Sequence, residues 1–264
     1  MNPKPAPESS PDTTTVQSLA RGLAVIRSFN GERPKQTLSE VAEVTGLARA
    51  TARRFLHTLV SLEYGGTDGT AFWLTPRVLE LGFSYLSGLE LPTIAQPRLE
   101  QLSRTLGESS SLSVLDGADV VYVNRVPVRK IMTVSITIGT RFPAFATSMG
   151  RVLLAALPED QLNKFLAVAD FDALTSRTKT SPADIKAELA LVKDQGFAIV
   201  DQELEPGLRS VAAPIYSPTG DVIAAINIST QSALRDAGEL THQVIPELLN
   251  TARAISADLK TASP

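Results

Sequence analysis

The chain has 264 residues with a formal net charge of -3, and 43% of them are hydrophobic, a composition typical of a globular protein with room for two domains. It contains no cysteine and only two histidines, which excludes disulfides and thiolate sites and disfavours a histidine-based metal site, so we expect no metal and no cofactor. No apolar run approaches the roughly 18 residues of a membrane span and no signal peptide is visible, so the sequence predicts a cytoplasmic protein.

The chain opens with a predicted tail and a predicted helix. Residues 1–14 are rich in Pro, Ser and Thr and lack an apolar segment, which predicts a disordered tail. Between residues 16 and 29 the apolar side chains recur at steps of three and four, the spacing of a helix; they are Val16, Leu19, Leu23, Ile26 and Phe29.

Two further helices separated by a tight turn are predicted next. Thr37 and Glu40 have the spacing of a capping box, which places a helix start at Thr37, and Gly46 ends that helix. A second helix over 48–62 has an inward-facing apolar stripe of Ala52, Phe55, Leu56, Leu59 and Leu62. Two helices joined by a turn containing glycine form a helix-turn-helix.

The outward face of this second helix is basic. Residues 15–91 carry eight basic and seven acidic side chains, so any binding of DNA depends on where the cations lie rather than on bulk charge. Arginine can bond guanine bidentately, and small residues let a helix approach the bases. A solvated basic face is the alternative. The predicted DNA-binding residues are Arg49, Ala50, Thr51, Arg53, Arg54 and His57.

A hairpin and a linking helix are predicted to complete the N-terminal third. Asp68-Gly69 is a type I′ turn signal, and Phe72, Trp73 and Leu74 indicate the return strand. The pattern therefore predicts a winged helix-turn-helix over 15–75. An apolar helix over 76–91 follows, and we expect it to pack on a second copy of the chain, with packing inside the chain as the alternative.

The remaining residues, 92–264, are predicted to form one α+β domain on a largely antiparallel sheet. Predicted helices cover 94–106, 148–157, 158–167, 181–196 and 234–259. Predicted strands cover two runs within 110–126, a third at 130–139, and three more at 197–202 and within 208–230, the last two joined by a hairpin at residues 217–220.

This domain shows no catalytic motif. There is no nucleophile elbow and no P-loop, and Ser148, Asp201 and His242 lack any local signature of a triad, so we expect no enzyme activity. Small residues around Ser148 at a helix start, together with Ser210, Asn227 and Ser229 on strands, are compatible with a pocket for a small polar ligand or with hydrogen-bonded polar core residues.

Several segments resemble the IclR family of bacterial transcriptional regulators. Within that family the resemblance is strongest to the Pca/Pob branch, which regulates aromatic-acid catabolism. These segments are SLARGLAVIRSF, TLSEVAEVTGLARATARRFLHTL, FWLTPRVLELGFSYL, FPAFATSMGRVLLAAL, GFAIVDQELEPGLRSVAAPI and VIAAINIST. The resemblance implies a winged helix-turn-helix, a linker helix that helps dimerise the DNA-binding domains, a GAF/profilin-like effector-binding domain, and dimers that often form tetramers.

The resemblance also implies a pocket for a small carboxylate, with apolar walls for a ring and amides and hydroxyls for the carboxylate. The matching effector-binding residues are Ile131, Val134, Ser148, Met149, Val200, Leu208, Ser210, Asn227 and Ser229, whereas Arg209 is expected to point away. The implied function is a sequence-specific DNA-binding regulator controlled by an aromatic or dicarboxylic acid. The alternatives are a residual enzyme activity in the C-terminal domain and a regulator without an effector.

The chain departs from the family pattern at three positions. Ala48 stands where many relatives have a capping serine, Glu63 stands where a glycine would favour the left-handed conformation, and Gly66 lies in the wing strand.

Overall fold

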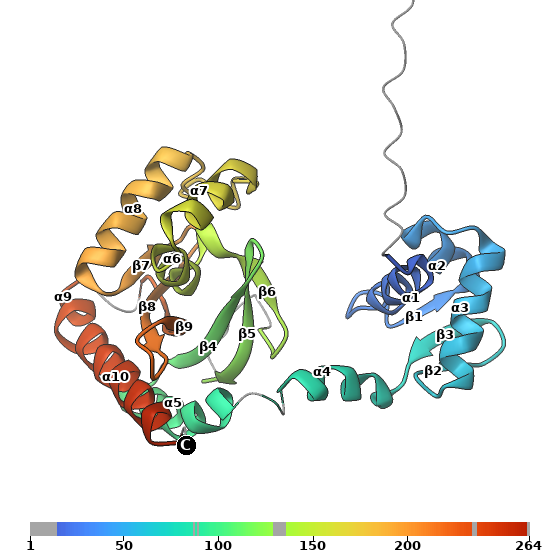
Figure 1. The fold of residues 1–264 in the computed structure, drawn as a ribbon, viewed down its shortest axis with the longest axis horizontal. Helices are drawn as coiled ribbons and strands as arrows, with labels where there is room; N and C mark the ends of the chain where they lie inside the picture. Colours follow the sequence, from blue (N-terminus) through green and yellow to red (C-terminus); the bar gives the residue numbers. More distant parts are fainter. Residues whose placement is uncertain (1–14, 87, 89, 129–135, 234–236, 263–264) are drawn as a thin grey trace, which may run out of the picture. The chain divides into compact units, whose positions relative to one another are not determined.

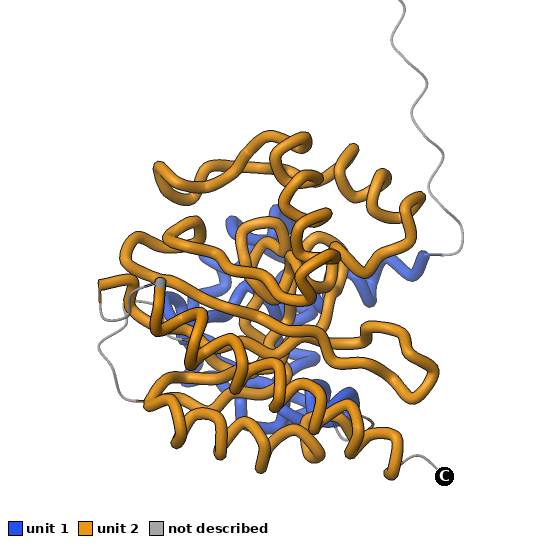
Figure 2. The backbone as a smooth tube through the Cα atoms, turned by 90° about the vertical axis from the view of Figure 1, so that its left-hand side faces the viewer, with its two compact units in different colours: residues 1–87 blue, residues 88–264 orange. Residues whose placement is uncertain are grey.

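The computed structural model describes residues 15–86, 88, 90–128, 136–233 and 237–262. The predicted tail, 1–14, therefore lies outside the described residues. The chain divides between Ser87 and Gly88 into two compact units (Figure 2). Within the described residues no helix is both long enough and apolar enough to cross a membrane.

The N-terminal unit consists of three helices and a small antiparallel sheet, followed by a short extension (Figure 1). The sheet has the order β1-β3-β2, and Val25, Val41, Ala52, Leu56 and Phe72 form its shared core with the helices. The elements are α1 (Gln17–Arg27), β1 (Lys35–Thr37), α2 (Leu38–Thr45), α3 (Arg49–Ser61), β2 (Gly65–Thr67), β3 (Ala71–Leu74), the 3-10 turn η1 (Pro76–Val78) and α4 (Leu79–Leu86).

Local sequence explains both ends of α2. The Thr37 hydroxyl accepts from the Glu40 backbone N–H, and the Glu40 carboxylate accepts from the Thr37 backbone N–H at 2.6 Å, which confirms the capping box. Gly46 ends the helix with φ 65°, a conformation that glycine adopts without a steric penalty. The helix-turn-helix predicted from spacing is therefore present.

The β2–β3 turn differs from the predicted type I′ turn. Gly69 has a positive φ but Asp68 does not, whereas a type I′ turn needs positive φ at both central residues. Instead the Asp68 carboxylate accepts from the backbone N–H groups of Thr70 and Ala71, at 3.0 and 2.8 Å, and closes a longer loop. These hydrogen bonds lower the pKa of the Asp68 carboxyl.

The two unusual residues of the wing have structural roles. Glu63 takes φ 64° without the help of a glycine, and its carboxylate pairs with Arg77. A Cβ on Gly66 would lie 2.5 Å from the Trp73 indole nitrogen, so the glycine leaves the space that the indole fills.

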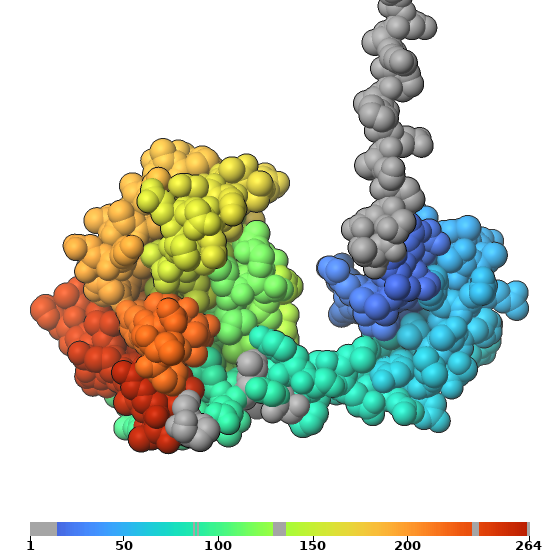
Figure 3. Space-filling view, in the orientation of Figure 1, coloured from blue at the N-terminus to red at the C-terminus, as the bar shows by residue number. Residues whose placement is uncertain are grey.

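The C-terminal unit is a six-stranded antiparallel sheet with helices on both faces (Figure 1). The strand order is β6-β5-β4-β9-β8-β7; α5 and α10 cover one face and α6 packs on the other, with α8 behind it. The strands are β4 (Ser109–Asp116), β5 (Asp119–Val126), β6 (Arg141–Pro143), β7 (Ala198–Asp201), β8 (Leu208–Tyr216) and β9 (Val222–Gln231). The helices are α5 (Glu90–Leu106), the 3-10 turn η2 (Ala144–Ala146), α6 (Ser148–Ala155), α7 (Glu159–Val168), α8 (Pro182–Gln195), α9 (Ala237–Glu239), the π turn η3 (Leu240–Val244) and α10 (Ile245–Ala262). Helices α8 and α10, orange and red, cover neighbouring parts of the unit's surface (Figure 3).

Three predicted elements of this unit need correction. The third strand was expected over 130–139, but residues 129–135 lie outside the described residues, 136–140 are not a strand, and β6 is at Arg141–Pro143 instead. Helix α5 begins at Glu90, earlier than 94, because Pro92 falls in its first turn, where proline is tolerated. The closing helix is interrupted by η3 before Pro246, whose ring cannot follow a regular α-helical turn.

Candidate functional sites

The first site is the outward face of α3. Arg49, Ala50, Arg53, Arg54 and His57 are exposed and Thr51 is half-buried. Ala52 and Leu56 face the core, with exposed fractions of 0% and 1%, so the helix can offer its basic face without uncovering the core.

The three guanidinium groups of this face are available to a partner. Among the described residues none of them makes an ion pair or a side-chain hydrogen bond, unlike Arg77 and Arg98, which pair with Glu63 and Asp258. The His57 ring meets the edge of Phe72 on β3, with centroids 5.9 Å apart, so one end of the face is held against the wing sheet. An exposed helix with unpaired arginines can donate hydrogen bonds to phosphates or base edges.

The start of α3 lacks a side-chain cap. Ala48 occupies the N-cap position with no side-chain hydrogen bond, and its backbone oxygen accepts from Thr51 and Ala52 at 2.8 and 3.0 Å. The first backbone N–H groups of the helix consequently point outward without a side-chain acceptor.

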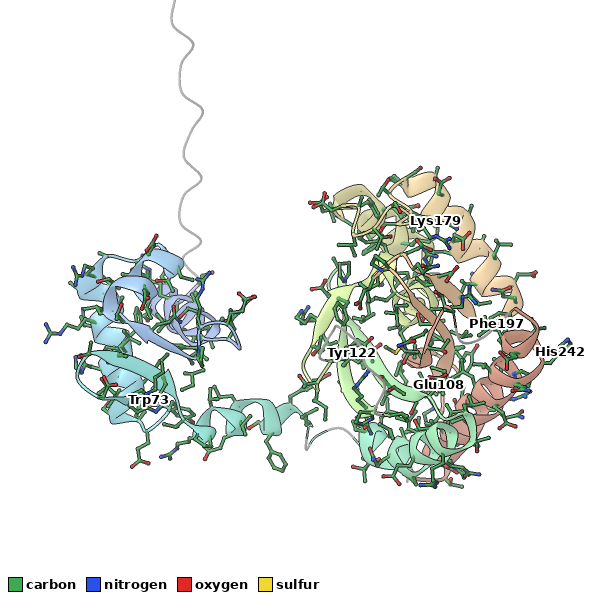
Figure 4. The ribbon with its side chains drawn as sticks, turned by 180° about the vertical axis from the view of Figure 1, so that it is seen from behind. Trp73, Glu108, Tyr122, Lys179, Phe197 and His242 are labelled. Carbon is green, nitrogen blue, oxygen red and sulfur yellow. The ribbon has the colours of Figure 1, made fainter. Side chains whose placement is uncertain are left out.

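We therefore expect Ala48→Ser to stabilise the N-terminal unit by about 1 kcal/mol, because the hydroxyl would accept from a free amide of the first turn. The measurement is urea unfolding followed by the fluorescence of Trp73, the chain's single tryptophan, which lies in this unit on β3 (Figure 4). Ala50→Ser is the control, since residue 50 belongs to the helix and is not its N-cap position. An equal urea midpoint for both variants would contradict the prediction.

The second site is a cavity in the C-terminal unit, between the start of α6 and the sheet. It has a volume of about 10 Å³, roughly the space of one water molecule. Its lining residues are Tyr122, Ile136, Ala146, Thr147, Ser148, Val200, Leu204, Leu208, Ser210, Asn227 and Ser229.

The structure brings six of the predicted effector-binding residues together here: Ser148, Val200, Leu208, Ser210, Asn227 and Ser229. Met149 is not among the lining residues; its buried side chain lies against β4, where its sulfur accepts from the Ser113 hydroxyl at 3.2 Å. Ile131 and Val134 lie outside the described residues. Five further lining residues were not predicted from the sequence: Tyr122, Ile136, Ala146, Thr147 and Leu204. The alternation of β5 contains a signal for Tyr122, but nothing local marks Leu204.

Two buried polar atoms at the cavity have no hydrogen-bond partner in the part of the chain that the structure describes. Only three buried side-chain polar atoms of the described residues lack a hydrogen-bond partner, and two of them, Ser148 Oγ and Asn227 Oδ1, belong to cavity residues. Asn227 Nδ2 donates to Ser229 Oγ at 3.2 Å. Because buried polar atoms are normally paired, these atoms are free to hydrogen-bond a water molecule or a polar group of a ligand in the cavity.

The segment that carries Ser148 is held tightly. Thr147 caps α6 by accepting from the Gly150 N–H at 3.1 Å. A Cβ on Gly150 would lie 2.0 Å from the Ala144 backbone oxygen, so only glycine allows α6 to approach η2 this closely. The N-terminal amides of α6 are thereby fixed beside the cavity.

A buried ion pair joins the two loops that line the cavity. Arg151 is 0% exposed and donates to Glu203 through both terminal nitrogens, at 2.8 and 2.6 Å, and to the Phe145 oxygen at 3.0 Å. Phe145 precedes Ala146 and Glu203 precedes Leu204, and both following residues line the cavity. The pair therefore fixes the positions of both cavity walls.

Tyr122 of β5, labelled in Figure 4, is a buried titratable group that lines the cavity. Burial raises the pKa of its phenol from 10.0 to about 12, with a smaller opposing effect of Arg125. In the unfolded chain the phenol ionises near pH 10, so stability is constant below that pH and falls as the pH rises toward 12, by at most about 2.7 kcal/mol.

We expect Tyr122→Phe to abolish this alkaline loss, which can be measured by urea unfolding at pH 8, 10 and 11. Tyr216→Phe, on an exposed tyrosine, is the control. A loss of equal size in the wild type and in Tyr122→Phe would show that another group is responsible.

The structure does not assemble a catalytic triad. Ser148 Oγ has no hydrogen-bond partner, the Asp201 carboxylate accepts from Arg177 and Arg209, and His242 is exposed on η3, where it projects from the unit (Figure 4). Across the part of the chain that the structure describes, no group of three or more His, Asp or Glu could hold a metal ion.

Comparison with known proteins identifies relatives of both units. Residues 18–64 match the model of the IclR helix-turn-helix domain, and residues 83–257 match that of the bacterial transcriptional regulator IclR C-terminal domain. The chain is 42% identical to the Pca regulon regulatory protein of Pseudomonas putida, over 94% of this chain and 86% of that protein. It is 36% identical to the p-hydroxybenzoate hydroxylase transcriptional activator of Acinetobacter baylyi, over 94% and 95%. A solved transcriptional regulator of Rhodococcus sp. RHA1 superimposes with a TM-score of 0.85 and 57% identity, over 94% of this chain and all of that one.

Proposed function

The chain belongs to the IclR family of bacterial transcriptional regulators, and we propose that it controls genes of aromatic-acid catabolism by binding their operators under the control of a small carboxylate. The observation that carries the proposal is the pair of sites in one chain: a helix with three unpaired arginines, and a small cavity with two unpartnered polar atoms. Such a regulator acts in the cytoplasm, where its DNA lies.

In this proposal α3 is the recognition helix. Arg49, Arg53 and Arg54 contact bases and phosphates in the major groove, with His57 at the far end of the contact. Ala50 and Thr51 let the helix come close to the base edges, where a methyl group can also touch thymine. The uncapped amides of the first turn, at Arg49 and Ala50, suit a backbone phosphate.

The N-terminal unit has an apolar surface that supports dimerisation. Leu79, Phe83 and Tyr85 of α4 are 71%, 68% and 54% exposed, although each is large and apolar. The same unit has an open apolar groove of about 300 Å³, lined by residues that include Leu19, Leu23, Phe55, Leu59 and Leu81. A second copy of the chain would bury both surfaces and set the spacing of two recognition helices. We propose that residues 15–75 form the DNA-binding domain, 76–91 the linker and 92–264 the effector-binding domain of this dimer, which can pair further into a tetramer.

The cavity would receive the effector. Tyr122, Val200, Leu204 and Leu208 provide apolar walls for a ring, and Ser148 and Asn227 provide hydrogen-bonding groups for its polar substituents. A volume of about 10 Å³ is far below that of a ligand site, so binding must move part of the lining. A ligand that binds only the form with the opened cavity increases the population of that form. In this proposal that form favours one arrangement of the two recognition helices in the dimer.

The test is a thermal-shift screen of the full chain with 4-hydroxybenzoate, protocatechuate and β-ketoadipate. A ligand at 100 times its Kd stabilises the folded state by about 2.7 kcal/mol, which raises the Tm of a unit of this size by roughly 5–10 °C. Asn227→Ala should remove most of that shift. If none of the acids changes the Tm, the effector part of the proposal is wrong and a regulator without a metabolite is favoured. Chemical conversion of a bound acid during incubation would favour the enzyme alternative.

A further inference from the structure

A row of polar residues leads away from the cavity across three neighbouring strands. Asn227 on β9 lies directly opposite Ser111 on β4, and Ser111 lies directly opposite Arg125 on β5. Residues opposite each other in an antiparallel sheet share a face, so all three lie on the side of α6 and the cavity. A second polar pair beside them, Ser109 with Ser229, has the same orientation. The polar face therefore continues from the cavity to Arg125.

Arg125 is a half-buried cation without a counter-ion. Its Nη1 donates to Ser111 Oγ at 3.2 Å, and among the described residues it has no acidic partner. Burial lowers the pKa of its guanidinium, and the nearby Tyr122 opposes this effect only weakly. A guanidinium has five N–H donors, and one hydroxyl satisfies only one of them.

The other arginines near the cavity are already neutralised. Arg151 is held by Glu203 at 2.6 Å, and Arg209 donates to Asp201 at 2.9 Å, away from the cavity lining. A half-buried cation that lacks a carboxylate in the protein is the group expected to bind one from a ligand.

We propose that Arg125 binds the carboxylate of the effector through its guanidinium, with Ser111 holding the guanidinium in place. The inference rests on the proposed function and assigns the two ends of the ligand: the ring lies against Tyr122, a ring hydroxyl meets Ser148 and Asn227, and the carboxylate extends along the polar row to Arg125. The effector is accordingly an aromatic acid with a second polar substituent, and the neutral amide of the same acid is a poor ligand.

The experiment compares 4-hydroxybenzoate with the neutral 4-hydroxybenzamide by titration calorimetry on the full chain. The wild type should bind the acid more tightly. Arg125→Gln should weaken acid binding about 10- to 100-fold, the range of a lost charge-assisted hydrogen bond, while amide binding changes less than about threefold. Arg125→Lys keeps the positive charge but not the paired N–H donors of the guanidinium, and should recover part of the preference for the acid over the amide.

Arg209→Gln is the matched control, since it removes the same charge from an arginine that Asp201 already occupies, and it should leave the acid-to-amide ratio unchanged. An unchanged ratio in both Arg125 variants, with wild-type binding intact, overturns the role of Arg125 but leaves the proposed function standing. A wild type that binds no aromatic acid overturns both. Circular dichroism of each variant checks that it folds, and the lysine variant serves if the glutamine variant does not.

Discussion

Replacing Arg53 and Arg54 together by alanine should weaken operator binding roughly 100-fold or more while leaving the stability of the N-terminal unit unchanged. Both side chains are exposed on α3 and have no partner in the described residues, so their removal breaks no contact within the unit. Each well-placed arginine contact to a base contributes about 1–3 kcal/mol, and two such contacts add to this loss.

The measurement is fluorescence anisotropy with a duplex selected by the wild-type protein from random sequences, at two salt concentrations. If the arginines contact phosphates, the double variant should also lose about two units of the slope of log K against log salt. If they read bases, the slope stays and discrimination between sequences falls instead.

The matched control is Arg21→Ala with Arg27→Ala, which removes the same charge from α1, where both side chains are exposed. This control should bind the operator within about threefold of the wild type if placement and not bulk charge decides affinity. Equal binding by the wild type and the α3 double variant would overturn the assignment of the recognition face.

The second large effect is expected at Arg151. Arg151→Met should destabilise the C-terminal unit by about 3–5 kcal/mol, because it leaves the Glu203 carboxylate buried without its partner. The Lys179 backbone N–H still donates to Glu203 at 3.0 Å, but one amide cannot replace a bidentate guanidinium. Arg151→Met with Glu203→Met should be less destabilised than either single variant, since it removes both buried charges, and Glu188, 3.7 Å from Arg151, keeps its ion pair with Lys179.

The two units allow an internal check of this prediction. Trp73 fluorescence reports the N-terminal unit alone, whereas far-UV circular dichroism reports both units. In Arg151→Met the urea midpoint followed by circular dichroism should therefore fall, and the midpoint followed by Trp73 fluorescence should stay at its wild-type value. Arg177→Met is the control, because Arg177 is 58% exposed where it pairs with Asp201 and such pairs contribute about 0–1 kcal/mol. A loss at Arg151 no larger than at Arg177 would show that the buried pair does not hold the cavity loops.

The sequence determined the parts of this protein that depend on neighbouring residues. Within each helix, residues three and four positions apart lie close together. This spacing predicted the capping box at Thr37, the two helices around Gly46 and the outward placement of Arg53 and Arg54. The hairpin at Asp68-Gly69 was also predicted, but its predicted type I′ turn was wrong, because the Asp68 side chain accepts hydrogen bonds from Thr70 and Ala71 and closes a longer loop. Alternation placed Asn227 and Ser229 on one face of their strand, and the family resemblance added Ser210 to the predicted pocket.

Only the tertiary structure decided which distant residues meet. Arg151 and Glu203 are 52 residues apart, and nothing in either local pattern selects one as the partner of the other. Arg125 reaches the polar row only through the register of β5 with β4 and of β4 with β9, and a shift of one residue would turn it to the opposite face. Strand register and loop packing depend on the whole sheet and its helices, so the place of Leu204 in the cavity wall and of Arg125 in the polar row could be found only once the strands were paired.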